Sequence, residues 1–189
     1  MRVERVIKDY RCGASPVREA LNRLAAEGLL ERYDQRGFSI RSVSAKELEE
    51  LTRTRCWLEE RALSESITNR TTAWEERLVL ALHKLSRASR HVQEKPSSRD
   101  PEWEKVHLDF HQALISACRS NFLITFCNQI ADQMHRYRVL TISEDAQRDC
   151  MEEHRLIAEA ALDGDIGKAV AALIAHYNKS AELCQAKLG

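Results

Sequence analysis

The chain has 189 residues, which is enough for one ordinary domain or for a small domain followed by a medium one. Apolar residues make up 43% and charged residues 31%, which is typical of a globular protein, and the scarcity of Gly and Pro favours helices over sheet. The sequence shows neither a signal peptide nor an apolar run long enough to cross a membrane. We therefore expect a cytoplasmic protein without a membrane partner.

The basic and acidic residues balance at 29 each, so the total charge does not indicate a nucleic-acid partner. Their distribution is more informative, because residues 1–44 hold nine basic and six acidic side chains and are net +3. A basic N-terminal segment followed by an acidic remainder is consistent with DNA binding by the N-terminal segment. The six cysteines form no C-x-x-C pair and fall among apolar helical positions, as reduced thiols of a cytoplasmic protein would.

The first 44 residues show the order of a winged helix-turn-helix. Ser15 and Pro16 are interpreted as the N-cap and first residue of the second helix, and Gly28 ends that helix. Apolar spacing predicts helices at 2–10 and 15–27 and strands at 29–33 and 38–43.

The remaining residues are predicted to be helical apart from one loop. Apolar residues at helical spacing predict helices at 45–69, 73–94, 101–118, 120–142, 145–163 and 165–187. The stretch at 94–101, rich in Pro and Ser, is the one clear loop. We predict a mainly α protein: an incomplete winged helix-turn-helix domain at 1–44, followed by an antiparallel six-helix bundle at 45–189.

The second helix carries the residues expected to read DNA. In a helix-turn-helix, the N-terminal turn of that helix enters the major groove, where the guanidinium of Arg18 can make a bidentate contact with guanine. Ser15 and nearby backbone amides can bind a phosphate, while Arg36 and Gly37 at the hairpin tip suit a wing that crosses the DNA backbone. An ordinary capped surface helix with a solvated arginine is the alternative.

The run SPVREALNRLAAEGLLERYDQRGFSI resembles the recognition helix and wing of GntR-type transcription regulators. The resemblance implies that Arg18 is the principal reader of a double-stranded DNA operator and that Arg36 and Gly37 are wing contacts. Ala14 stands where the family often has another arginine. The family's first helix lies upstream of the point where this chain starts, so we expect an incomplete DNA-binding domain.

Four of the seven histidines lie where a bundle could bring them together. His107 and His111 are four residues apart and share one helix face, while His154 and His176 lie on two later helices. Three antiparallel helices can point four imidazoles at one interior point, and imidazole suits Zn²⁺, Ni²⁺, Cu²⁺ or Fe²⁺. Solvated or core histidines are the alternative.

The bundle resembles the FadR C-terminal (FCD) sensor domain, which follows GntR-type heads. The matching segments are LEELTRTRCWLEERAL, HLDFHQALISACRSNFL and EEHRLIAEAALDGDIGKAVAALIAHY. In that family a metal ion is held by D-x-x-x-H and by histidines of two later helices. The resemblance places these ligands at His107, His111, His154 and His176, with His107 where the family usually has aspartate.

Replacing a carboxylate by an imidazole removes a negative charge and softens the site. This favours Zn²⁺, with Ni²⁺ as a second candidate, over Mn²⁺ or Mg²⁺. Four neutral ligands leave the charge of the dication uncompensated, so we expect an anionic effector, a small carboxylate metabolite. Arg55 and Arg138 could pair with its other end, and ordinary surface arginines are the alternative.

We therefore expect a transcription regulator that acts as a homodimer and is not an enzyme. Its bundle would bind a metal ion and an organic acid and so modulate operator binding. One alternative is a regulator for which the metal itself is the signal. The other is a metal-dependent helical-bundle enzyme, although no Ser–His or Cys–His arrangement with a defensible spacing supports it.

Overall fold

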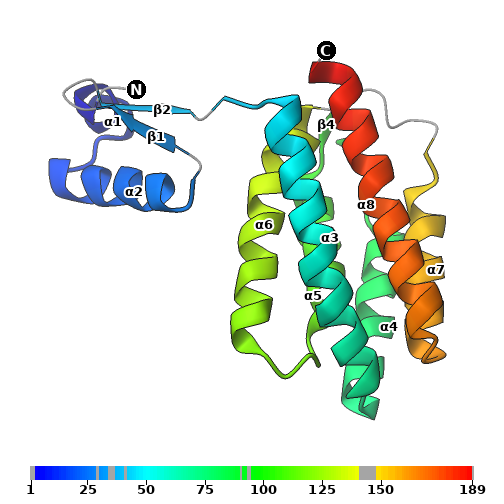
Figure 1. Ribbon diagram of the computed structural model, residues 1–189. Coiled ribbons are helices and arrows are strands. Elements are labelled where there is room, and N and C mark those ends of the chain that lie inside the picture. Colours follow the sequence, from blue (N-terminus) through cyan, green and yellow to red (C-terminus); the bar gives the residue numbers. More distant parts are fainter. Residues whose placement is uncertain are drawn as a thin grey trace. The chain divides into compact units, whose positions relative to one another are not determined.

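The computed structural model describes residues 3–28, 30–33, 37–40, 42–89, 91–92, 95–140 and 148–188. The chain divides into two units, Met1–Ser44 and Ala45–Gly189. Helices dominate both units, which confirms the predicted mainly α fold class (Figure 1).

The first unit consists of two helices and an antiparallel hairpin. Its elements are α1 (Val3–Tyr10), α2 (Ala14–Ala26), β1 (Leu30–Tyr33) and β2 (Gly37–Ile40). Val17 and Leu21 of α2 pack with Leu30 of β1 and Phe38 of β2 to form a small hydrophobic core. This core fixes the helix pair against the hairpin.

The predicted N-cap of α2 is wrong. Gly13, with extended backbone at φ −70° and ψ 160°, precedes the helix, and no side chain caps it. Ser15 therefore lies inside the first turn together with Pro16, whose missing N–H costs nothing at this position. At the other end, Gly28 adopts a positive φ of 76°, as predicted for the residue that ends the helix.

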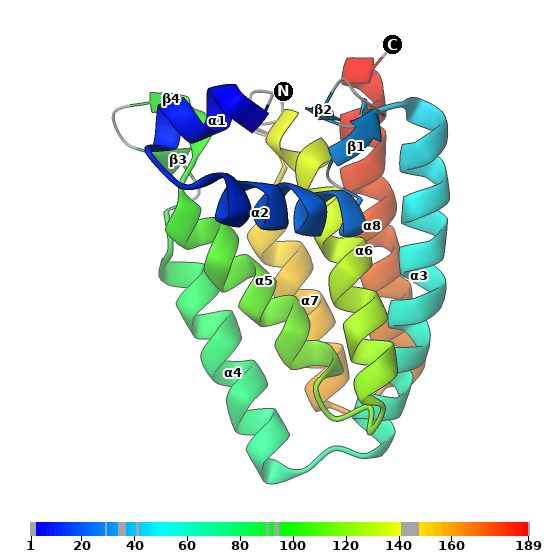
Figure 2. The same ribbon diagram turned by 90° about the vertical axis from the view of Figure 1, so that its left-hand side faces the viewer.

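The second unit is a bundle of six helices arranged in two layers. α3 lies between α6 and α8 in one layer, and α4 lies between α5 and α7 in the other (Figures 1 and 2). The helices are α3 (Ala45–Thr68), α4 (Thr72–Arg87), α5 (Pro101–Ile115), α6 (Asn121–Leu140), α7 (Cys150–Leu162) and α8 (Ile166–Leu188).

Buried apolar side chains from both layers form one core. Members with at most 1% exposure include Leu63, Ile67, Leu78, Phe110, Leu114, Ile157 and Leu173. The indole N–H of Trp74 on α4 donates to the carbonyl of Ala113 on α5 at 2.9 Å, which joins these helices at a polar point inside the core. Asp100 and Asp149 cap α5 and α7 by accepting bonds from backbone N–H groups of the first turn. The two helices that carry three of the four histidines therefore each begin at a side-chain cap.

Two sequence expectations in this unit are wrong. The helix predicted over 73–94 ends at Arg87, because Ala88 adopts an extended backbone with ψ 134°. The residues predicted as a loop contain β4 (Lys95–Arg99), which pairs antiparallel with β3 (His91–Val92). Proline at position 96 cannot supply a helical N–H but is compatible with a short edge strand.

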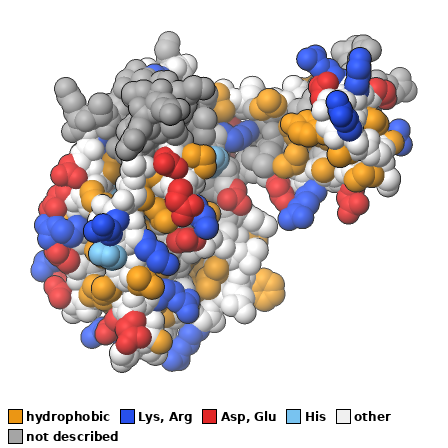
Figure 3. Space-filling view, turned by 180° about the vertical axis from the view of Figure 1, so that it is seen from behind, with side chains coloured by type: hydrophobic (Ala, Val, Ile, Leu, Met, Phe, Trp, Pro, Cys, Tyr) orange, Lys and Arg blue, Asp and Glu red, His pale blue; other side chains and the backbone are white. Residues whose placement is uncertain are grey.

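Acidic and basic side chains are interspersed over the face of the larger unit seen in Figure 3. This mixture fits a solvated surface rather than a single charged stripe along the bundle. Among the described residues, none of the helices is both long and apolar enough to span a membrane.

Candidate metal centre

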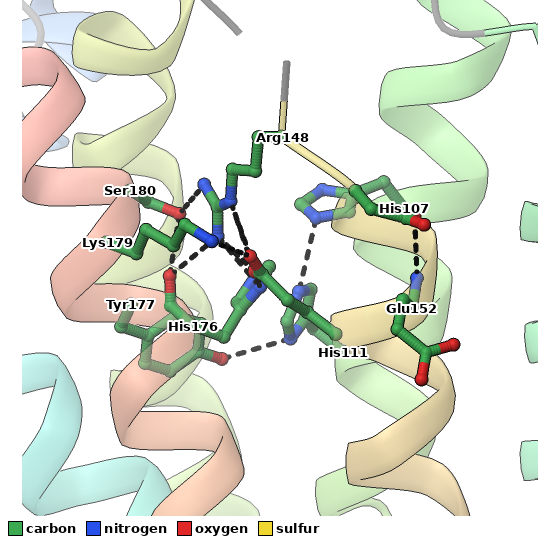
Figure 4. Close-up of polar contacts among 10 residues, drawn as sticks. His107, His111, Arg148, Glu152, His176, Tyr177, Lys179 and Ser180 are labelled. Carbon is green, nitrogen blue, oxygen red and sulfur yellow. Dashed lines mark hydrogen bonds and ion pairs between the residues drawn. The ribbon is translucent and has the colours of Figure 1, made fainter.

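Three helices bring the four predicted histidines together inside the bundle. His107 and His111 lie on α5, His154 on α7 and His176 on α8, and one nitrogen from each ring lies within 4.8 Å of the others. All four side chains are buried, with at most 5% exposure. Figure 4 shows His107, His111 and His176 around a common point.

The spacing along α5 explains how two of these rings meet. Residues four apart lie on one face, so Trp103, His107 and His111 form a continuous stripe. The indole of Trp103 stacks on the ring of His107 with centroids 4.6 Å apart, and the Nε2 atoms of His107 and His111 are 3.2 Å apart.

A buried network on α3 and α8 orients His111. The Tyr177 hydroxyl donates to Glu59 and accepts from Arg55 Nη2 at 3.1 Å, and its oxygen lies 3.0 Å from His111 Nδ1. Because the single hydroxyl proton goes to the carboxylate, we assign the proton of His111 to Nδ1, which donates to Tyr177. The lone pair on His111 Nε2 then faces the centre.

Glu153 orients His176 in the same way. His176 Nδ1 lies 2.8 Å from Glu153 Oε2, so we assign its proton to this contact, which leaves Nε2 bare. Arg148 holds Glu153 through Nε at 2.9 Å, and its guanidinium also donates to Ser180 at 2.8 Å and to the His176 carbonyl at 2.9 Å (Figure 4).

Two orphaned nitrogens test whether the site fits a metal ion. His154 Nε2 and His107 Nδ1 are buried and have no hydrogen-bond partner among the described residues. The bare Nε2 of His111 must also face either a proton on His107 or a cation. Buried polar atoms are rarely left unsatisfied, so a cation bound to His154 Nε2 and to the Nε2 atoms of His107 and His111 accounts for the lone pairs at the centre, whereas it leaves His107 Nδ1 without a partner among the described residues.

One of the nitrogen–nitrogen distances and the donor types also fit a transition metal. Tetrahedral zinc with Zn–N bonds of about 2.0–2.1 Å separates its nitrogens by about 3.3 Å, close to the 3.2 Å between the Nε2 atoms of His107 and His111. Four imidazoles without a carboxylate form a donor set suited to Zn²⁺, Ni²⁺ or Cu²⁺.

Burial keeps all four imidazoles neutral. Desolvation lowers the pKa of His107, His111 and His154 well below 6.5, and repulsion from neighbouring cations and imidazoles lowers it further. Desolvation also lowers the pKa of His176 to about 4, although Glu153 opposes that change. Neutral imidazole is the form that binds a metal.

The two arginines predicted for an effector both line a small cavity of about 30 Å³ beside the histidines. Arg55 pairs with Glu59 at 2.7 Å, and this carboxylate outweighs burial and raises the pKa of Arg55. Burial lowers the pKa of Arg138, although Glu104 lies 3.5 Å away. Both arginines are largely buried, so the alternative of ordinary surface arginines does not hold.

Sequence reasoning missed the residues that support the histidines. Glu59 follows Arg55 by four residues, the spacing of an ion pair along one helix face, and this signal could have identified it. Glu153 and Tyr177 are direct neighbours of His154 and His176 in sequence, yet each serves a histidine on a different helix. The sequence position of a residue beside one histidine does not indicate that its side chain contacts a different histidine.

The predicted DNA-reading residues lie in the first unit. Ser15 and Arg18 are exposed on α2, and Gly37 begins β2 with a positive φ of 89°. Arg36 lies outside the described residues.

Comparison with protein families matches both units. Residues 50–179 match the FCD domain family, and residues 1–40 match the family described as bacterial regulatory proteins, gntR family. The HTH-type transcriptional regulator BphR of Paraburkholderia xenovorans (strain LB400) is 35% identical over 179 residues, which cover 94% of this chain and 73% of that protein. The HTH-type transcriptional repressor GlaR of Escherichia coli (strain K12) is 28% identical over 174 residues, which cover 89% of this chain and 78% of that protein.

A solved structure shares the fold. The E. coli McbR/YncC structure superposes with a TM-score of 0.79 at 22% identity, and the match covers 100% of this chain and 88% of the other.

The stability of the metal-free protein is expected to fall on acidification. Because the pKa of His176 is about 4 in the folded protein and 6.5 is its ordinary value, the unfolded chain binds an extra proton between these pH values. The stabilisation is complete above pH 6.5 and is lost as the pH falls toward 4, by about 3 kcal/mol for this group.

Chemical denaturation of chelator-treated protein across this pH range measures the loss. His176→Gln should make the loss smaller, and His83→Gln on the exposed face of α4 should leave it unchanged. Equal pH dependence of His176→Gln and the unmodified protein would contradict the assignment of a neutral His176.

Proposed function

The chain belongs to the gntR family of bacterial regulatory proteins and carries an FCD domain, and we propose that this DNA-binding regulator senses a small organic acid through a metal ion held by His107, His111, His154 and His176. One observation carries the proposal: four neutral imidazoles from three helices converge at one buried point, and two of them have their second nitrogen held by Glu153 and Tyr177. Metal-binding histidines are commonly held in this way.

The charges around the site favour an anionic ligand. Each of the three arginines that line the cavity has an acidic partner: Glu59 for Arg55, Glu104 for Arg138 and Glu153 for Arg148. The histidines add no charge, so a bound divalent ion, with Zn²⁺ favoured and Ni²⁺ second, would supply uncompensated positive charge, and a carboxylate would bind it as a fifth ligand. We propose that Arg55 and Arg138 pair with the other end of the acid.

α3 supplies a direct connection to the DNA-binding head. It begins at Ala45, immediately after the first unit, and its buried Arg55 and Glu59 contact Tyr177, which contacts His111. A ligand that shifts these side chains would therefore act on the helix that follows the head. The proposed operator contacts are Ser15 and Arg18 of α2 and the wing residues Arg36 and Gly37.

The size of the cavity supports a second candidate, in which the metal itself is the signal. A volume of about 30 Å³ holds an ion with one or two waters, but an organic acid requires neighbouring side chains to move. Stabilisation by zinc alone would favour this candidate, whereas further stabilisation by an acid only in the zinc-loaded protein favours acid sensing. The metal-dependent enzyme is set aside, because the matching families and relatives are transcription regulators.

We also propose that the protein acts as a homodimer. α3 and α6 pack against each other, and they expose three aromatic side chains: Trp57, Phe122 and Phe126. Large exposed aromatics on adjoining helices are typical of an interaction surface, and a second copy would place two recognition helices on one operator.

Metal binding depends on His111 in this proposal. Purified protein that has been stripped with a chelator should bind one Zn²⁺ per chain in calorimetry and should bind Mn²⁺ much more weakly, because it offers imidazoles rather than carboxylates. His111→Ala should lose zinc binding, while His83→Ala on α4 should retain it. Unchanged zinc stoichiometry in His111→Ala would place the metal elsewhere.

Dimerisation should depend on the aromatic side chains of α6. Replacing Phe122 and Phe126 by Glu introduces charge where the second copy would bury apolar surface, so the dimer should dissociate more than 10-fold more readily. Sedimentation equilibrium measures this change, with Val79→Glu, an equally exposed site on α4, as the control. A monomeric unmodified protein at micromolar concentration, or identical dimerisation in the variant, would refute the assignment.

A further inference from the structure

We propose that the effector site has a second, apolar compartment beyond Trp103, and that the effector is therefore a carboxylic acid with an apolar body such as an aryl group. This inference rests on the proposed function, because the acid head is taken to bind beside the four histidines. It adds the chemistry of the rest of the ligand.

A second cavity adjoins the one beside the histidines. It has a volume of about 280 Å³ and lies where the end of α4, the start of α5 and the start of α7 meet. The two cavities share four wall residues: Trp103, Arg148, Cys150 and His154. A ligand that shifts the side chains of Trp103 or Cys150 in this shared wall would therefore occupy both spaces while His154 and Arg148 stay in place.

The walls of this second compartment are mixed: five of the nine wall residues are apolar, and the other four are Ser86, Arg148, Asp149 and His154. Leu85, Ala88, Trp103 and Met151 present apolar surface to it. Its polar side chains away from the histidines are already engaged: Ser86 donates to the His83 carbonyl at 2.8 Å, and Asp149 accepts from the Glu152 backbone at 2.9 Å. A polyhydroxylated body would lose its hydration here without gaining matched partners.

Apart from Asp149, the charged groups lie at the opposite end. Arg148 stands between the two spaces, and its guanidinium points to Glu153, Ser180 and the His176 carbonyl rather than toward Leu85 or Ala88. A ligand with its anionic end beside Arg148 and the histidines would place its remaining atoms against Trp103 and Met151. The site thus matches an amphipathic acid in both polarity and direction.

The volume sets the size of the apolar body. An apolar cavity of about 150 Å³ is enough to hold benzene, so a compartment of about 280 Å³ accommodates one aromatic ring or a short branched chain. Bulky sugar acids are excluded by polarity rather than by size.

Calorimetry with the zinc-loaded protein tests the compartment, with acetate, phenylacetate and gluconate as probes. Phenylacetate should bind about 30-fold more tightly than acetate, because its ring buries apolar surface that acetate lacks, and gluconate should gain nothing over acetate. Ala88→Phe fills the compartment without touching a histidine or an arginine. It should remove the advantage of phenylacetate and leave the affinity for acetate unchanged.

Ala73→Phe, at an exposed position in the first turn of α4, is the control and should bind all three acids normally. Met151→Ala widens the compartment and should improve the binding of 1-naphthylacetate, which provides an independent variant. Equal affinity for acetate and phenylacetate, or no effect of Ala88→Phe, would overturn the second compartment and leave acid sensing intact. Failure of every acid to bind the zinc-loaded protein would overturn the proposed function as well.

Discussion

The burial of four imidazoles at one point of the bundle is the constraint on which the rest of the sensor depends. Protonated rings at this spacing would repel one another in a medium that screens them poorly, and neutral rings turn lone pairs toward one another. The protein settles the first problem by desolvation, which lowers the pKa of every ring. Tyr177 and Glu153 hold the protons of His111 and His176 on Nδ1, so the Nε2 lone pairs of these two rings face the centre. Under the proposed function, a cation at the centre would complete the arrangement, and its charge would favour an acidic effector.

The buried ion pair of Arg55 and Glu59 connects this centre to the DNA-binding head. Such a pair is weak evidence for stability, because desolvation of both charges offsets much of their attraction. The importance of the Arg55–Glu59 pair lies instead in where the two residues are placed. Both residues lie on α3, the helix that directly follows the head, and both contact the hydroxyl of Tyr177 beside His111. In the proposed mechanism, a change at the histidines would reach α3 through Tyr177 and this ion pair.

Local patterns predicted the bundle and the four histidines, but not the partners of those histidines. His107 and His111 reveal their shared face through their spacing alone, and family resemblance added His154 and His176. Glu153 and Tyr177 were missed because each serves a ring on another helix, and that pairing depends on helix rotation within the fold. The start of α2 and the β3–β4 hairpin were misjudged because the extended backbone at Gly13 and Ala88, rather than side-chain periodicity, sets those boundaries. The compartment beyond Trp103 joins residues of α4 and α7 that lie far apart in the sequence, so no local pattern reports it.

An operator titration tests the central claim most directly. The affinity of the protein for its selected operator fragment would be measured without zinc, with zinc, and with zinc plus the carboxylate that binds the zinc-loaded protein most tightly. The account predicts that the acid changes operator affinity only when zinc is present. It also predicts that the operator changes the affinity for the acid by the same factor, as linkage requires. Operator affinity that is unchanged by the acid in the zinc-loaded protein would contradict the account.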